Sequence, residues 1–313
     1  MVDAFIQERE LFPPLMPFQS GFLMRNHHEI YYEQCGNRSG LPILFLHGGP
    51  GAGSAPAHRR LFDPKRFRLV LFDQRGCGQS RPNASLDDNS TDLLIDDIEA
   101  LRQSLNIDKF ILFGGSWGST LALAYSIAYP ENVSGLILRG IFLGSRSEVN
   151  WFLNDMGRFF PEAHDRFTGH LDLAERGDLL NSYFNRLTDP DPAIHQKAAE
   201  AWASYETSCS TLRAGNRHVS GAGALTMARI EAHYFIHDCF MPRNHIIDNI
   251  GRVAHLPVII VQGRHDVICP PVTAFNLAAK WGHNADLQII DAAGHSTFES
   301  GIAHALMAAL DKI

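Results

Sequence analysis

The sequence predicts an α/β protein with a mostly parallel sheet flanked by helices. Short apolar runs recur along the chain, each closed by glycine or a polar turn, and they have the composition of buried strands. Helical stretches separate several of these runs, and such alternation favours a parallel sheet. The chain has 313 residues, of which 45% are hydrophobic and 19% charged, so it suits one large α/β unit or a core that carries an insertion.

Six apolar runs are predicted to be strands buried on both faces. In chain order they are 43–46, 68–72, 110–113, 136–138, 258–261 and 287–290. A helix is predicted over 91–106, because apolar residues recur at helical spacing from Leu94 to Leu105 after a capping signal at Ser90 and Thr91.

The strand pattern disappears from about residue 144 to 245, where aromatic and helix-favouring sequence replaces it. Strand character returns at Pro257. We therefore expect a core made of residues 1–143 and 246–313, with a helical cap inserted at 144–245.

Charge and cysteine content exclude several classes of protein. The formal net charge is −7 and no block of Lys or Arg forms a basic stripe, so no nucleic-acid partner is expected. No apolar run reaches the ~18 residues of a membrane span. The amino-terminal residues 1–10 carry acids where a signal peptide would carry positive charge, which favours a cytoplasmic protein. The five cysteines are odd in number and scattered, which favours reduced thiols over disulfides: Cys35, Cys77, Cys209, Cys239 and Cys269.

A candidate nucleophile lies at the end of the third predicted strand. Gly114-x-Ser116-x-Gly118 follows the run 110–113 and precedes a helix of small residues. A tight turn between strand and helix would hold Ser116 in a strained conformation with its hydroxyl exposed, and glycines on both sides allow the close approach of neighbouring chain.

A serine hydroxyl needs a histidine to remove its proton and a carboxylate to orient that histidine. In chain order, Asp266 follows the strand 258–261 and His295 follows the strand 287–290, which is the order that a strand–turn–helix nucleophile requires. The other candidates nearby are the carboxylates of Asp286 and Asp291 and the imidazole of His265.

The developing oxyanion requires backbone N–H donors. The loop after the first predicted strand contains Gly48 and Gly49 and is a candidate source of one donor, and the N–H of Trp117 is the other. The same loop lacks the spacing and the lysine of nucleotide-binding loops, so a nucleotide is not expected.

Two further patterns suggest structural roles. Asp73 ends a predicted strand but precedes Ser116 in the chain, so we expect it to order Arg75 and the glycine-rich turn that follows. His233 and His237 lie four residues apart without the glutamate of a zinc-binding HExxH motif, so we expect a pair on one helix face and no metal site.

Five motifs together resemble those of proline iminopeptidases (prolyl aminopeptidases) of the α/β-hydrolase fold. They are HGGPG at 47–51, DQRG at 73–76, GGSWGS at 114–119, LRGIF at 138–142 and AGHS at 293–296. The resemblance covers nearly the whole chain. It implies release of N-terminal proline from short peptides through a prolyl acyl-enzyme on Ser116, without a metal or cofactor.

The resemblance also implies a set of substrate-binding residues. Burying the free secondary ammonium of proline is costly unless carboxylates meet it. The family's two cap glutamates correspond to Glu206 and Glu231 in this sequence. Other pocket positions correspond to Phe142, Phe152, Arg139 and Cys269, and the ring of Trp117 is a further candidate for the apolar wall.

The sequence departs from the family pattern at three places. Tyr205 replaces a Trp, His265 replaces a Tyr, and the segment from Glu206 to Ala228 is shorter. These departures concern the shape of the pocket and therefore the strictness for proline. A small-ester or amide hydrolase and a non-catalytic ligand-binding protein remain alternatives. The sequence predicts no oligomeric state.

Overall fold

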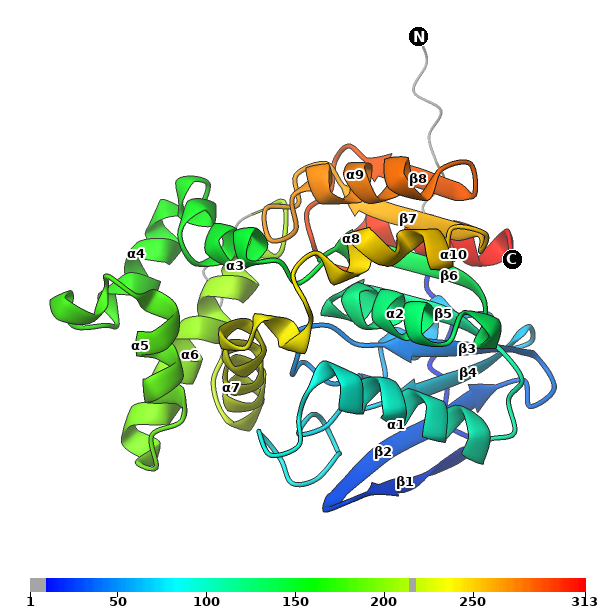
Figure 1. Cartoon of the computed structure of the whole chain (residues 1–313), viewed down its shortest axis with the longest axis horizontal. Helices are drawn as coiled ribbons and strands as arrows, with labels where there is room; N and C mark the ends of the chain where they lie inside the picture. The colour runs from blue at the N-terminus through cyan, green and yellow to red at the C-terminus, as the bar shows by residue number, and fades with distance from the viewer. Residues whose placement is uncertain (1–9, 214–217) are drawn as a thin grey trace, which may run out of the picture.

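Strands of the chain form a single sheet in the computed structural model, which describes residues 10–213 and 218–313. Within these residues the order is β1-β2-β4-β3-β5-β6-β7-β8 (Figure 1). The strands β4, β3, β5, β6, β7 and β8 run parallel to one another. The strands are β1 (Gln19–Arg25), β2 (His28–Gly36), β3 (Leu41–Leu46), β4 (Phe67–Phe72), β5 (Phe110–Ser116), β6 (Val133–Ile141), β7 (Val258–Gly263) and β8 (Ala285–Ile290). The predicted α/β fold with a mostly parallel sheet is confirmed.

Each of the six predicted runs lies within a strand, but two strands were missed and one was misjudged. β1 and β2 pair antiparallel at one edge of the sheet. β1 is largely exposed, so it lacks the apolar run that marks a buried strand. The expectation that all six runs are buried on both faces is wrong for β8, which is half-buried along its length because it forms the other edge.

The core lies on both faces of the sheet. Alternate residues of β3 belong to different hydrophobic clusters, with Leu44 and Leu46 in one and Ile43 and Phe45 in the other. Helices cover both faces, α1, α2 and α9 packing with the first cluster and α10 with the second. Their bounds are α1 (Thr91–Ser104), α2 (Trp117–Ala128), α9 (Pro271–Trp281) and α10 (Ser300–Asp311).

Helix α1 begins where the capping signal predicted, with Ser90 at the N-cap position. The Ser90 side chain makes no capping hydrogen bond, however. Thr91 instead donates its hydroxyl to the Cys239 carbonyl oxygen at 2.5 Å. This contact joins the core helix to the segment that leads back from the inserted helices.

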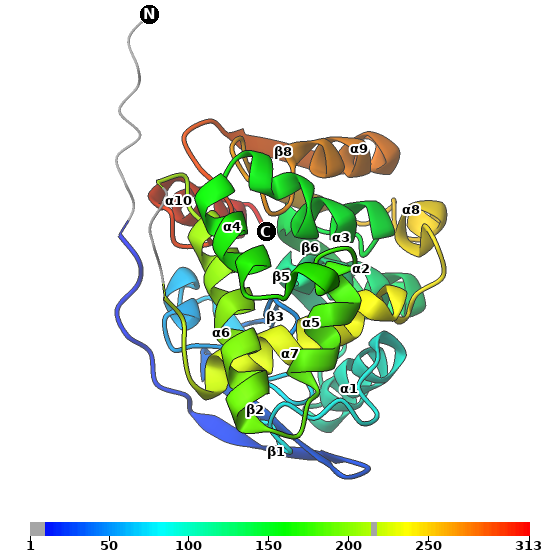
Figure 2. The same ribbon diagram turned by 90° about the vertical axis from the view of Figure 1, so that its left-hand side faces the viewer.

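The chain between β6 and β7 is helical, and most of it stands beside the carboxyl ends of the strands (Figures 1 and 2). The helices are α3 (Arg146–Leu153), α4 (Pro161–Gly169), α5 (Leu179–Leu187), α6 (Pro192–Cys209), α7 (Ala222–Ile236) and α8 (His245–Asn249). We refer to α3–α7 as the cap. α8 packs instead against α2 of the core.

The five cysteines are free and buried. None of the helices within 10–213 and 218–313 is both long and apolar enough to cross a bilayer. The amino-terminal sequence behind the expectation of a cytoplasmic protein lies, except for its last residue, outside the described residues.

Candidate active site

Ser116 occupies a sharp turn between β5 and α2. Its φ of 58° and ψ of −128° are unusual for a residue with a side chain, and it is the N-cap residue of α2. A Cβ atom on Gly114 would overlap the Gly118 carbonyl, and a Cβ atom on Gly118 would overlap the Leu46 carbonyl. The glycine spacing in the sequence therefore has the steric origin that the motif indicates.

Asp266 and His295 are brought together from the loops after β7 and β8. His295 Nδ1 lies 2.8 Å from Asp266 Oδ2. The other carboxylate oxygen of Asp266 accepts the Cys269 N–H at 2.8 Å, and Gln262 Nε2 donates to Oδ2 at 3.1 Å. Both Asp266 and His295 are buried. The carboxylate thus accepts three hydrogen bonds, one of them from the imidazole, and the other two hold it in place.

The rival candidates have other partners. Asp291 is highly exposed and pairs with Arg264, and Asp286 pairs with Lys312. His265 is exposed. Among the carboxylates that the sequence left open, only Asp266 contacts His295.

The second nitrogen of His295 contacts an arginine. Arg139 Nη1 lies 3.0 Å from His295 Nε2, and it also donates to the His295 carbonyl oxygen at 2.9 Å. Arg139 Nη2 donates to Thr297 Oγ1 at 2.8 Å. Because a guanidinium only donates, Nε2 must accept and the imidazole proton resides on Nδ1, facing Asp266. Burial lowers the pKa of Arg139, and the charge of Asp266 opposes this effect.

Ser116 makes no hydrogen bond with His295 in this arrangement. Its hydroxyl instead lies beside the Cys269 thiol. Burial raises the pKa of Cys269 well above its usual value, Asp266 raises it further, and the hydrogen bond with Ser116 opposes them. Ser116 and His295 nevertheless line one cavity, so a small rearrangement of side chains can bring them into contact.

The loop after β3 lies against the nucleophile. A Cβ atom on Gly48 would lie 3.3 Å from Ser116 Cβ and 3.1 Å from the Gly115 carbonyl oxygen. Gly49 adopts a φ of 106°, which favours glycine. Trp117 is the first residue of α2, where the N–H groups have no acceptor within the helix. Gly48, Gly49 and Trp117 thus lie around the serine, as an oxyanion hole would require.

The Trp117 ring is part of the protein interior and not of the cavity wall. It is fully buried, its Nε1 donates to Gln74 Oε1 at 2.8 Å, and it packs edge-on against Tyr234. Gln74 Nε2 in turn donates to the His47 carbonyl oxygen at 2.9 Å. The ring therefore connects the nucleophile turn to the glycine loop. It does not line the cavity that contains Ser116, contrary to its suggested place in the apolar wall.

The two glutamates come from neighbouring cap helices, Glu206 from α6 and Glu231 from α7. Trp202 Nε1 donates to Glu231 Oε2 at 2.6 Å. Glu206 Oε2 is buried without a hydrogen-bond partner. Burial raises the pKa of Glu206 to about 7, although a hydrogen bond from Glu231 lowers it. Burial and the charge of Glu206 raise the pKa of Glu231 well above its usual value.

A cavity of about 170 Å³ connects the nucleophile to the cap. It is smaller than the ~300–1,000 Å³ of sites for drug-sized ligands, so it suits a single small group. The residues that line it include Gly48, Gly49, Ser116, Arg139, Glu206 and His295. The structure thus brings together residues of the triad, the glycine loop and the cap.

Phe142 and Phe152 are not among the residues that line this cavity. Both are buried and pack against Phe235, at ring-centroid distances of 5.9 and 5.8 Å. Phe152 also packs against Trp202, whose indole holds Glu231. Phe152 therefore packs against the indole that binds Glu231, whereas Phe142 contacts Phe235.

Asp73 has a structural role, but the expected contact with Arg75 is wrong. Asp73 accepts the N–H groups of Ser54 and Gln79 at 2.7 and 2.8 Å, which holds the glycine-rich turn. Arg75 pairs instead with Asp97, at 2.6 Å from Nε to Oδ2. Spacing along the chain could not identify Asp97 as the partner of Arg75, because their contact depends on how α1 packs against the turn after β4.

His233 and His237 bind backbone carbonyl oxygens. His233 Nε2 contacts the Asn89 oxygen at 2.9 Å, and His237 Nδ1 contacts the His233 oxygen at 2.8 Å. Their rings pack together near the end of α7. Each histidine thus contributes one ring nitrogen to a structural contact.

Comparison with known proteins shows the family to which this chain belongs. A family model described as the alpha/beta hydrolase fold matches residues 42–302. Proline iminopeptidase of Arabidopsis thaliana is 44% identical, covering 99% of this chain and 84% of that protein. Probable proline iminopeptidase of Leptolyngbya boryana is 45% identical, covering 97% of each. The chain belongs to the proline iminopeptidase family of α/β hydrolases. The resemblance inferred from the five motifs is therefore confirmed.

A solved structure described as proline iminopeptidase of Mycobacterium smegmatis has a TM-score of 0.61, covering 94% of this chain and 98% of that one. Its identity to this chain is 18%, so this likeness supports the fold alone.

Sequence reasoning missed four residues in this member of the proline iminopeptidase family. His58 and Thr297 line the cavity beside Ser116. Gln74 and Gln262 hold the glycine loop and Asp266, respectively. Thr297 lies two residues beyond the proposed base, which was an available signal. Buried glutamines carry no comparable signal, because their role depends on contacts between distant strands.

Proposed function

We propose that this chain hydrolyses the bond after an N-terminal proline in short peptides, with Ser116 as nucleophile, His295 as base and Asp266 as its orienting acid. One observation carries the proposal. A buried carboxylate oxygen of Glu206 has no partner, and Glu206 lines the same small cavity as Ser116. A buried acceptor without a donor is costly, so a ligand that donates hydrogen bonds is the natural partner.

The free imino group of proline fits this need because, when protonated, it carries one positive charge and two N–H donors. Glu206 lines the cavity and can accept one of these donors. Glu231 is not among the residues that line the cavity, but it is hydrogen-bonded to Glu206, and it accepts the other donor if the substrate reaches past Glu206. Two buried carboxyl groups without a cation favour the protonated form of at least one, as their raised pKa values indicate. Binding the ammonium favours ionisation of the pair, and the charge so formed holds the substrate.

Acylation begins when the Ser116 hydroxyl replaces Arg139 as the partner of His295 Nε2. His295 then takes the hydroxyl proton as the serine oxygen bonds to the prolyl carbonyl carbon. Asp266 stabilises the resulting imidazolium. The oxyanion accepts N–H groups from Trp117 and from the loop of Gly48 and Gly49. The carbon–nitrogen bond breaks, and the leaving amine takes the proton from His295.

Deacylation repeats these steps with water. His295 removes a proton from water as the water oxygen attacks the prolyl ester. Ser116 recovers its proton from His295 when the ester bond breaks. The products are free proline and the shortened peptide. Cys269 lies beside the serine hydroxyl in the resting arrangement but does not line the cavity, and its raised pKa keeps the thiol neutral.

The cap makes the site suitable for short peptides that enter by their amino end. Five buried free thiols support a reducing compartment and thus a cytoplasmic peptidase.

The testing experiment compares proline β-naphthylamide with its N-acetylated form and with an unrelated ester. The wild-type protein should cleave the free proline compound and leave the acetylated one intact, and Ser116→Ala should abolish cleavage while the circular dichroism spectrum stays unchanged. Glu206→Gln should lower kcat/KM for the proline compound by about 100-fold. It should change ester hydrolysis by less than about threefold.

Glu200→Gln provides the matched control, since Glu200 lies on the same helix and is not among the cavity residues. Equal cleavage of the free and acetylated compounds would contradict recognition of the imino group and indicate a general amide or ester hydrolase. Full activity of Ser116→Ala would contradict the assignment of Ser116 as the nucleophile.

A further inference from the structure

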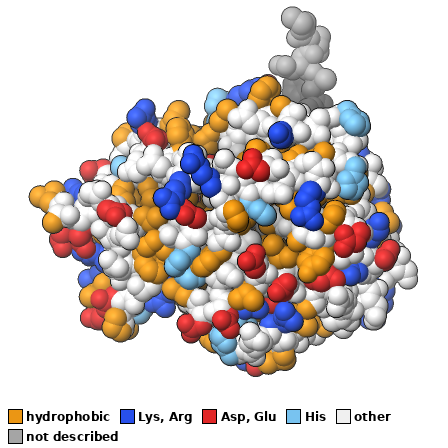
Figure 3. Space-filling model, viewed as in Figure 1, with side chains coloured by type: hydrophobic (Ala, Val, Ile, Leu, Met, Phe, Trp, Pro, Cys, Tyr) orange, Lys and Arg blue, Asp and Glu red, His pale blue; other side chains and the backbone are white. Residues whose placement is uncertain are grey.

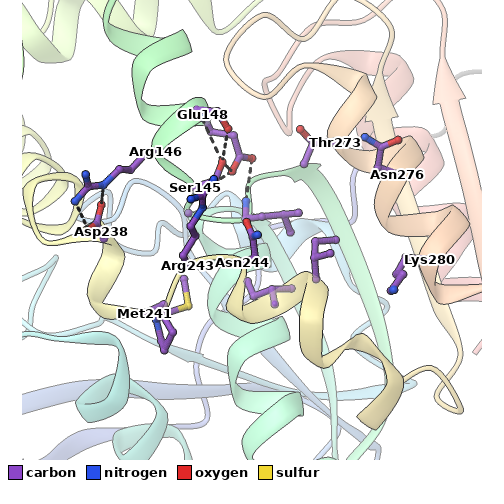
Figure 4. A pocket seen from close by; sticks show the side chains of 16 residues that line it. Ser145, Arg146, Glu148, Asp238, Met241, Arg243, Asn244, Thr273, Asn276 and Lys280 are labelled. Atoms are coloured by element: carbon purple, nitrogen blue, oxygen red, sulfur yellow. Dashed lines mark hydrogen bonds and ion pairs between the residues drawn. The ribbon is translucent and has the colours of Figure 1, made fainter.

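A second and larger cavity lies away from the proposed catalytic residues, where the chain crosses between core and cap. Its volume is about 880 Å³. The residues 143–148 lead from β6 into the cap, the residues 238–247 lead back to the core, and both segments line the cavity together with α9 (Figure 4). None of Ser116, Asp266 or His295 lines it. The volume is in the range of small-molecule sites.

Three of the charged groups in this cavity already have partners. Arg146 and Asp238 form a two-pronged ion pair with distances of 2.6 and 2.7 Å. Glu148 accepts the N–H groups of Leu143 and Ser145 at 3.0 and 2.9 Å, and the Ser145 hydroxyl at 2.6 Å. The negative charges are thus engaged within the protein, as the dashed contacts in Figure 4 show.

The remaining two charged groups are cations. Arg243 precedes α8 and Lys280 lies near the end of α9, so they reach the cavity from different segments. Both side chains are exposed, and neither has a hydrogen bond or ion pair within the described part of the chain. Thr273 and Asn276 add polar groups from the same helix as Lys280. The cavity therefore presents two positive charges that no carboxylate of its own neutralises.

Apolar side chains form the rest of the wall. Ile246 is buried in the main hydrophobic cluster, and Leu143, Met241 and Ile247 pack against that cluster. On the face shown in Figure 3, hydrophobic side chains gather where the cap meets the core, next to Lys and Arg side chains. The apolar wall and the unpaired cations Arg243 and Lys280 together favour a ligand that has both an apolar body and a negative group.

Arg243 and Lys280 lie on opposite sides of the cavity (Figure 4). We propose that this cavity binds a small amphipathic carboxylate, with its charged group at one of these two cations and its apolar body on Ile246, Met241 and Leu143. The carboxyl end of an apolar peptide and a free aliphatic acid share this chemistry. A bound molecule contacts both chain crossings and α9, so it ties the cap to the core. Binding stabilises the folded protein, because the site depends on all three segments.

Isothermal titration calorimetry on the full chain tests the proposal with three probes: N-acetyl-leucyl-phenylalanine, octanoate, and N-acetyl-leucyl-phenylalanine amide. We expect at least one acid to bind with a dissociation constant of about 1 mM or lower. The amide, which lacks the charge, should bind about tenfold more weakly than its acid. The tighter acid identifies the source, a peptide end or an aliphatic acid.

The variant Arg243→Gln/Lys280→Gln should weaken binding of the acid about tenfold and leave hydrolysis of proline β-naphthylamide unchanged. The control Lys65→Gln/Lys109→Gln removes the same net charge at exposed positions outside the cavity and should bind like the wild type. Circular dichroism checks that each variant is folded.

Three results would overturn the proposal. They are no binding of either acid up to about 10 mM, equal binding of acid and amide, and equal effects of the two double variants. The first two exclude a carboxylate site, and the third means that net charge alone governs binding. A failure of proline hydrolysis would leave these measurements unaffected, so the two proposals can fail separately.

Discussion

At the scale of single residues, Glu206 and Glu231 form the costliest feature of the site. Two carboxyl groups are buried side by side, Glu206 Oε2 lacks a partner, and the one donor near Glu231 is the Trp202 indole. Such an arrangement opposes folding whenever a carboxyl ionises, since the charge is removed from water without a compensating cation. A cationic substrate supplies the missing counter-charge. Binding of the substrate therefore removes the penalty that the ionised carboxyl imposes on the empty site.

The raised pKa of Glu206 predicts how stability depends on pH. In the unfolded chain this carboxyl ionises near its usual value of 4.5, and in the folded chain near 7. Between these values the folded state holds a proton that the unfolded state has lost, so the free energy of unfolding falls as pH rises. We expect the wild type to lose stability from pH 5 to pH 8, and Glu206→Gln to lose less, in urea unfolding at each pH.

Glu200→Gln serves as the control for this measurement, since it removes a half-buried carboxyl from the same helix. The wild type and Glu206→Gln would have parallel stability profiles if Glu206 ionised normally in the folded protein, and that result would contradict the prediction.

At the scale of elements, the start of α3 determines how the chain enters the cap. The Ser145 side chain accepts the Glu148 N–H at 3.3 Å, and the Glu148 carboxylate accepts the Ser145 N–H at 2.9 Å. This capping box satisfies donors that the first turn of a helix leaves free. Glu148 also accepts the Leu143 N–H, so one side chain fixes both the helix and the segment before it.

Ser145→Ala should therefore lower the free energy of unfolding by about 1 kcal/mol. Thermal and urea unfolding would measure the loss. Ser300→Ala is the matched control, because Ser300 is the exposed first residue of α10 and does not cap that helix. We expect the control to change stability by less than about 0.5 kcal/mol. Equal losses in the two variants would argue against a role for the capping box.

At the scale of the whole molecule, Asp97 joins three distant parts of the chain. Its carboxylate binds Arg75, which follows β4, through two nitrogens at 2.6 and 2.8 Å, and Arg25 at the end of β1 at 3.0 Å. Asp97 itself lies on α1. The side chains of Asp97 and Arg75 are essentially inaccessible to solvent. The antiparallel edge of the sheet is thereby tied to its parallel part.

Asp97→Asn should destabilise the fold by about 3 kcal/mol, because it leaves the buried guanidinium of Arg75 without its counter-charge. Asp96→Asn changes the neighbouring, exposed carboxylate and should have little effect. Equilibrium unfolding of both variants at neutral pH measures the difference. A loss below about 1 kcal/mol for Asp97→Asn would show that the ion pair contributes no more than a surface pair.

The sequence alone determined the features that depend on local sterics and local periodicity. Buried parallel strands require continuous apolar runs, so all six such runs lie in strands. The glycines around Ser116 are required by backbone contacts within one turn and its neighbouring strand, so the motif indicated both the turn and the nucleophile. The antiparallel strands β1 and β2 were missed, because β1 is largely exposed and β2 alternates buried and half-buried residues over its first half, and such strands need no continuous apolar run.

Tertiary structure alone decided which distant side chains meet. Three aspartates lay close enough in sequence to serve His295, and the packing of the loops after β7 and β8 selected Asp266. The contact of Arg139 with His295 Nε2 follows from the pairing of β6 with β7, and the pairing of Arg75 with Asp97 from the position of α1. Such contacts depend on how elements pack, since residues far apart in the chain leave no local pattern for their meeting.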